Sequence, residues 1–176
     1  MKKVYIIVGS MRPHWLGKRI AQWVRVTAKT QTKAAITIVD ADDIILSDSD
    51  RVSRPGERRK YDLADADGYI VIAPEYESGK ETVVRSVVAA LEQAESQKPV
   101  AFVSYGLHGG SKLVDKLRAQ VRRLDLAPLR NAVHIAKPWD IIDESGELHD
   151  ADQEKVLRHM IKQLSGWMAT ASPQAV

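Results

Sequence analysis

The chain of 176 residues contains no cysteine, a single phenylalanine and an aromatic fraction of only 6%. The absence of cysteine excludes disulfide bonds, thiol nucleophiles and zinc sites with cysteine ligands. No apolar run approaches the roughly 20 residues that a membrane-spanning helix needs. The Lys2-Lys3 start leads into an apolar run that is too short for a signal peptide. We therefore expect a cytoplasmic protein without a membrane partner.

The sequence also lacks an excess of one charge, because 26 Lys and Arg residues face 23 Asp and Glu residues, for a net charge of +3. Residues 51–60, half of them basic, are the local exception. No recognisable nucleic-acid-binding motif or set of stacking aromatics accompanies them. We expect a solvated loop there and no nucleic-acid partner; contact with the phosphates of a second nucleotide is the alternative. The five histidines lack metal-ligand spacing, so no metal site is expected.

Short apolar runs alternate with stretches of helical periodicity along the whole chain. The runs have the character of strands covered on both faces and occupy residues 3–8, 35–39, 69–73, 99–105 and 132–135. Helical spacing follows them at residues 16–28, 81–95, 111–124 and 150–168, with a further short helix at 61–66 and a long connection over 44–60. In the last helix, Val156, Met160, Leu164 and Trp167 are expected to share the buried face.

This alternation predicts an α/β fold with parallel strands and right-handed crossovers. The chain length favours a flavodoxin-like three-layer sandwich with a five-stranded parallel sheet in the order 2-1-3-4-5. We expect one domain over residues 1–168 and a flexible C-terminal tail over 169–176. In such a sheet, ligands bind beyond the carboxyl ends of the strands, where the first and third strands diverge.

The loop after the first predicted strand has the features of a phosphate site. It carries Ser10 and Arg12 ahead of a predicted helix N-terminus. Free backbone N–H groups, a hydroxyl, a guanidinium and the positive end of a helix dipole all favour an anion. The alternative is that Ser10 and Arg12 only cap the helix. The context favours a phosphorylated cofactor.

Three motifs in chain order resemble the NADPH-dependent FMN reductase family, which includes flavodoxin-like quinone, azo-dye and chromate reductases. They are Gly9-Ser10-Met11-Arg12, Pro74-Glu75-Tyr76-Glu77-Ser78 and the segment from Ser104 to Gly110. The resemblance covers about residues 3–135. It implies FMN as cofactor, NADPH or NADH as electron donor, and hydride transfer through FMN to a flavin, a quinone or a similar small-molecule acceptor. It also implies a homodimer or homotetramer.

The resemblance also implies roles for individual residues. Ser10 and Arg12, with backbone groups near Leu16 and Gly17, would hold the FMN phosphate. The isoalloxazine ring and ribityl chain would be bordered by Pro74, Glu75, Tyr76, Glu77 and Ser78. At the far edge of the ring, the backbone would approach closely at the loop formed by Ser104, Gly106, Gly109 and Gly110. Glu75 and Tyr76 have a purely structural alternative, in which a carboxylate ties loops together or meets an arginine of a partner subunit. No catalytic acid or base is assigned, because the cofactor carries the chemistry.

Three positions depart from the family pattern. Glu77 stands where Asn is usual, Trp15 where the nearest subgroup often has a second Arg, and Gly17 where a hydroxyl residue is usual. Loss of one cationic contact costs about 1.5–3 kcal/mol, or roughly tenfold to hundredfold in affinity.

Two features could offset or exploit these departures. Lys18 or Arg19 would compensate by folding back towards the phosphate loop, and the Trp15 indole would cover the flavin or close that loop. The alternative function is a non-catalytic flavodoxin-like binding or regulatory protein with a weakened or lost flavin site. A flavodoxin-type electron carrier is disfavoured by the near-neutral charge.

Overall fold

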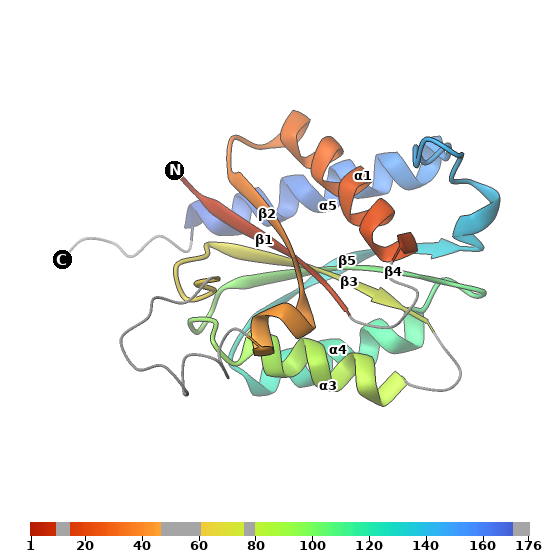
Figure 1. The fold of residues 1–176 in the computed structure, drawn as a ribbon. Helices are drawn as coiled ribbons and strands as arrows, with labels where there is room; N and C mark the ends of the chain where they lie inside the picture. The colour runs from red at the N-terminus through yellow and green to blue at the C-terminus, as the bar shows by residue number, and fades with distance from the viewer. Residues whose placement is uncertain (10–14, 47–60, 76–79, 171–176) are drawn as a thin grey trace.

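The computed structural model describes residues 1–9, 15–46, 61–75 and 80–170. Five strands alternate with helices along this part of the chain (Figure 1). The strands are β1 (Lys3–Val8), β2 (Ala35–Asp40), β3 (Gly68–Pro74), β4 (Pro99–Gly106) and β5 (Ala127–Ala136). The helices are α1 (Trp15–Gln31), α3 (Lys80–Leu91), α4 (Ser111–Arg123), the 3-10 turn η1 (Pro138–Asp140) and α5 (Ala151–Thr170), with a further short helix at residues 41–46.

The five strands form one parallel sheet in the order β2-β1-β3-β4-β5, which confirms the predicted order. Helices α1 and α5 cover one face of the sheet, and α3 and α4 cover the other (Figure 1). Every residue of β3 and β4 is buried, as expected for inner strands covered on both faces. The fold is therefore the predicted flavodoxin-like three-layer sandwich, in which β1 and β3 are neighbours at the centre.

Alternation along β1 divides the core into two layers. Ile6 packs in the cluster that includes the α1 and α5 side chains Ile20 and Leu157, whereas Ile7 packs in the cluster that includes Val87 of α3. Both isoleucines are fully buried. Because successive strand residues point to opposite faces, one apolar run supplies both layers.

The buried face of α5 differs from the prediction. Val156 and Trp167 are 41% and 48% exposed. The buried side chains of this helix are Leu157, Met160, Ile161, Leu164 and Met168. The predicted and observed stripes share Met160 and Leu164, so helical periodicity alone could not separate them. Packing of α5 against β4, β5 and α1 selects the observed stripe.

Other differences lie at the ends of elements. Residues 61–66 form turns and not a helix, whereas residues 41–46 form a helix that overlaps the start of the connection predicted over 44–60. Helix α3 ends at Leu91, before the predicted residue 95, and the chain then turns through the left-handed residue Gln97. Strand β5 begins five residues earlier than predicted, and α5 continues to Thr170. Within the described ranges, no helix is both long and apolar enough to cross a membrane.

Candidate functional site

The predicted site residues that the structure describes lie on loops at the carboxyl end of the sheet. They belong to three regions: Trp15, Leu16 and Gly17 begin α1 after β1; Pro74 ends β3 and Glu75 follows it; and Ser104, Gly106, Gly109 and Gly110 lie at the end of β4 and in the turn into α4. The remaining predicted residues, Ser10, Arg12, Tyr76, Glu77 and Ser78, lie outside the described residues. Their roles stay predictions.

Glu75 connects the loops after β3 and β4. Its backbone N–H donates to the Tyr105 carbonyl at 2.6 Å, and its carboxylate Oε2 accepts a hydrogen bond from the His108 N–H at 2.8 Å. A Cβ atom at position 106 would lie only 2.6 Å from the Cβ of Glu75, so Gly106 permits this close approach. The Glu75 carboxylate thus ties two loops together, as in the structural alternative for this residue.

The turn into α4 requires glycine at two successive positions. Gly109 and Gly110 have φ values of +83° and +79°, in the left-handed region that L side chains rarely adopt. Gly110 is the N-cap of α4, and a Cβ there would lie 2.9 Å from the Cβ of Ser104. The loop therefore carries bare backbone, packed closely against β4, up to the start of the helix.

Behind this loop, Ser104 forms a polar pair with His134. The two residues are register partners on β4 and β5. The Ser104 hydroxyl donates to the Gly109 carbonyl at 2.5 Å and lies 2.8 Å from Nδ1 of His134. Ser104 is fully buried, and burial lowers the pKa of His134 below its ordinary value. Sequence reasoning singled out Ser104 but missed His134, whose only signal is its position at the end of the last apolar run.

The start of α1 is packed against the ends of two strands. A Cβ at Gly17 would lie 2.9 Å from the Tyr105 hydroxyl oxygen and 3.1 Å from Cγ1 of Val8. A side chain at position 17 would therefore require the Tyr105 side chain to shift. This packing holds the N-terminus of α1 at the carboxyl ends of β1 and β4.

Arg19 is engaged away from the role suggested for it. Its guanidinium carbon lies 5.8 Å from the centre of the Trp15 ring, and its Nη1 donates to the Glu144 carbonyl at 3.3 Å. Trp15 is 52% exposed. In this structure Arg19 connects α1 to the segment after η1, and the Trp15 indole is paired with that cation.

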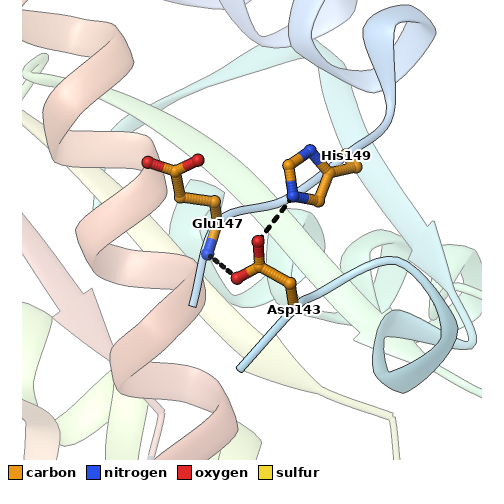
Figure 2. Close-up of side chains that lie close together, drawn as sticks. All are labelled: Asp143, Glu147 and His149. Atoms are coloured by element: carbon orange, nitrogen blue, oxygen red, sulfur yellow. Dashed lines mark hydrogen bonds and ion pairs between the residues drawn. The ribbon is translucent and has the colours of Figure 1, made fainter. Parts of the chain in front are cut away.

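The segment that Arg19 contacts is a tight turn closed by side chains. Asp143, Glu147 and His149 each place one oxygen or nitrogen within 4.8 Å of the others (Figure 2). The Asp143 carboxylate accepts hydrogen bonds from Ser145 Oγ at 2.6 Å and from the Glu147 N–H at 3.0 Å, and it pairs with His149. All three side chains are exposed, and these bonds account for the conformation of the turn.

A surface cavity of about 570 Å³ lies at the carboxyl ends of β1 and β2. Its lining includes Val8 and Lys18 together with the carboxylates of Asp40, Asp42 and Asp43. Val8 and Lys18 connect it to the loop after β1, but it contains none of the described residues predicted for the cofactor.

Comparison with known proteins identifies similar chains. The NADPH-dependent FMN reductase family matches residues 2–140. The chain is 30% identical over 148 residues to the NAD(P)H-dependent FMN reductase C4B3.06c of Schizosaccharomyces pombe, covering 77% of this chain and 74% of that protein. It is 28% identical over 144 residues to the NAD(P)H-dependent FMN reductase LOT6 of Saccharomyces cerevisiae, covering 70% and 75% respectively.

Solved structures support the fold. The flavoenzyme NAD(P)H:(acceptor) oxidoreductase FerB of Paracoccus denitrificans superimposes with a TM-score of 0.70 at 17% identity, covering 97% of this chain and 98% of that one. A short-chain flavodoxin associated with a bacterial microcompartment superimposes with a TM-score of 0.60 at 15% identity, covering 98% and 100%.

Proposed function

Because this chain belongs to the NADPH-dependent FMN reductase family, we propose that it transfers hydride from NADPH or NADH to bound FMN and then to a flavin, a quinone or a similar small-molecule acceptor. The family is one of oxidoreductases, and its cofactors are FMN and a nicotinamide donor. The observation that carries the proposal is the match of this family to residues 2–140. We also propose that the protein is cytoplasmic and that it assembles as a homodimer or homotetramer.

The described residues at the carboxyl end of the sheet fit a flat, phosphorylated cofactor. Gly106, Gly109 and Gly110 allow the loop after β4 to pack closely on Glu75, His134 and Ser104, which holds its backbone at the carboxyl end of the sheet. The N-terminus of α1 is held beside the end of β1 by the packing of Gly17 on Tyr105. The N–H groups in the first turn of a helix have no partner within the helix, and together with the helix dipole they favour an anion such as the FMN phosphate.

We propose the following residues for the cofactor. Ser10 and Arg12 hold the phosphate with backbone groups of Leu16 and Gly17. The loop after β3 borders the ring and ribityl chain through Pro74, Glu75, Tyr76, Glu77 and Ser78. The loop after β4, with Ser104, Gly106, Gly109 and Gly110, borders the far edge. Trp15 lies at the edge of this proposed cofactor site, beside Arg19.

Bound FMN supplies the capacity to accept and donate hydride. The protein groups bind the cofactor, orient it and shield it from water. Glu75 fixes the spacing between the loops after β3 and β4 through its bonds to Tyr105 and His108. Ser104 fixes the Gly109 carbonyl. The proposal requires no proton transfer by a side chain during the first half-reaction.

The test is a titration of the purified protein with FMN, followed by quenching of flavin fluorescence. We expect micromolar or tighter binding by the wild type and about tenfold to hundredfold weaker binding by Arg12→Ala. Arg123→Ala is the matched control, because this exposed arginine lies at the end of α4 remote from the carboxyl ends of the strands. FMN-dependent oxidation of NADH and NADPH with a quinone acceptor is then assayed. A wild type that binds no FMN would overturn the proposal and favour the non-catalytic alternative.

A further inference from the structure

The pairing of β4 with β5 buries a serine and a histidine behind the glycine-rich loop over residues 106–110. Ser104 faces His134 in the parallel register, with Ser104 fully buried and His134 half-buried. Ser104 Oγ lies 2.5 Å from the Gly109 carbonyl oxygen and 2.8 Å from His134 Nδ1. The histidine backbone is itself held from α5, because Gln153 Nε2 donates to the His134 carbonyl at 3.0 Å.

The single hydroxyl proton of Ser104 determines the direction of both bonds. A serine hydroxyl donates one hydrogen bond, and the Gly109 carbonyl can only accept. The hydroxyl proton therefore goes to Gly109, and His134 must carry a proton on Nδ1 to donate to Ser104 Oγ. The result is a directed chain of bonds from His134 through Ser104 to the Gly109 carbonyl.

This chain orients the peptide bond between Gly109 and Gly110. The C=O and N–H of a trans peptide point in opposite directions. With the Gly109 oxygen held against Ser104, the Gly110 N–H points away from Ser104, at the N-terminus of α4. Glycine at both positions removes the restraint that a side chain would place on this peptide. Ser104 and His134 hold its carbonyl oxygen, in addition to the backbone bonds from the Gly109 N–H to the Gly106 carbonyl and from the Val114 N–H to the Gly110 carbonyl.

The pair is not arranged for nucleophilic catalysis. Ser104 is 0% exposed, and its proton is directed to a carbonyl and not to the histidine. A nucleophilic serine needs an exposed oxygen and a base that accepts its proton. The geometry therefore supports orientation of the backbone and not attack on a substrate.

We propose that His134 is a positioning residue for the flavin, acting through Ser104 to hold the Gly109–Gly110 peptide ready for the ring. This inference rests on the proposed function, because it takes the loop after β4 as part of the FMN site. It adds a residue that contacts no cofactor and lies on the edge strand β5.

The test compares two substitutions of His134. They separate the effect of losing the hydrogen-bond donor from the effect of changing the side-chain volume. His134→Asn keeps an N–H donor near the position of Nδ1 but is smaller, whereas His134→Leu keeps bulk and removes the donor. His159→Leu, on the exposed side of α5, is the matched control. Each variant is titrated with FMN and with riboflavin, which lacks the phosphate.

We expect His134→Leu to bind both ligands about tenfold to hundredfold more weakly, because it leaves the Ser104 oxygen without its donor. His134→Asn should stay within about threefold of the wild type, as should His159→Leu. Arg12→Ala should lose affinity for FMN and not for riboflavin. If His134→Leu does not fold, Ser104→Ala replaces it and must weaken the binding of riboflavin by a similar factor.

The outcomes separate the two proposals. A wild type that binds neither ligand overturns the proposed function and this inference together. A wild type that binds FMN, with His134→Leu or Ser104→Ala binding equally well, overturns only the inference. Equal losses in His134→Asn and His134→Leu also overturn it, since they would show that packing and not the donor matters.

Discussion

His149 Nε2 lies 2.7 Å from Asp143 Oδ2 across the turn that follows η1 (Figure 2). The bond from Ser145 lowers the pKa of Asp143 most, and the bond from His149 adds to that effect. The same Asp143 carboxylate raises the pKa of His149. Arg19 of α1 donates to the Glu144 carbonyl within this turn, so the ion pair lies in a segment that α1 contacts.

The first prediction concerns this pair. We expect the pKa of His149 to lie above its ordinary value of 6.5 and to return towards it in Asp143→Asn. Because the folded-state pKa is raised, the stabilisation from this histidine is complete below pH 6.5 and is lost as the pH rises through the folded-state pKa. NMR titration of the His149 ring protons measures the shift. An identical titration curve in both proteins would contradict it.

The second prediction concerns His134, whose pKa is shifted in the opposite direction. Burial lowers it first, Arg118 lowers it further, and the Gly109 carbonyl and Asp115 raise it. The stability associated with neutral His134 is complete above pH 6.5 and is lost as the pH falls through the folded-state pKa. In urea unfolding, the wild type should lose more stability than His134→Asn on acidification below pH 6.5. Parallel losses in the two proteins would contradict this expectation.

The third prediction uses two glycines in opposite situations. Gly110→Ala should lower the free energy of unfolding by about 1–3 kcal/mol, because a left-handed backbone at φ +79° and a contact of 2.9 Å with Ser104 both penalise a Cβ. Gly166→Ala, in α5 with nothing within 4 Å of the added Cβ, should raise it by up to about 1 kcal/mol. Urea denaturation measures both. Equal effects would show that backbone conformation and contact do not decide the outcome.

The fourth prediction tests a buried hydroxyl. Tyr69 on β3 is fully buried, and its hydroxyl donates to the Leu63 carbonyl. Tyr69→Phe should cost about 1–3 kcal/mol, because it leaves a buried carbonyl without its donor. The control is Tyr5→Phe, which changes the half-buried register partner of Tyr69 on β1 and should cost less. Chemical denaturation of the two variants gives the comparison, and an equal cost would contradict a special role for the Leu63 bond.

Strand prediction succeeded for the inner strands and for the edge strand β2, and it missed the early part of the other edge strand, β5. The bounds predicted for β1 are those observed, because a continuous apolar run marks an inner parallel strand. The early part of β5 was missed because it holds Pro128 and Arg130 on an edge strand. Arg118 of α4 donates to the Leu129 and Arg130 carbonyls there, a contact that no local pattern reveals.

In the candidate site too, some features could be predicted from the sequence and others could not. The three loops could be placed at one end of the sheet from strand order alone, because parallel strands all end on the same side. The tie from Glu75 to His108 and the pair of Ser104 with His134 could not be placed. Each joins residues on different strands or loops, so each depends on the register between neighbouring strands.

Periodicity and turn composition, which are local properties, together with chain length were sufficient for the strand order and the layered architecture. The loops assigned to the cofactor stay a prediction. The orientation of α5, the engagement of Arg19 by Trp15 and Glu144, and the bonds from His134 to Gly109 were decided only by the folded chain. Two apolar stripes of one helix that share residues cannot be told apart from the sequence, because only packing of the sheet against one of them decides which is buried. A polar side chain likewise has many partners of suitable chemistry, and only distance in the folded state selects among them.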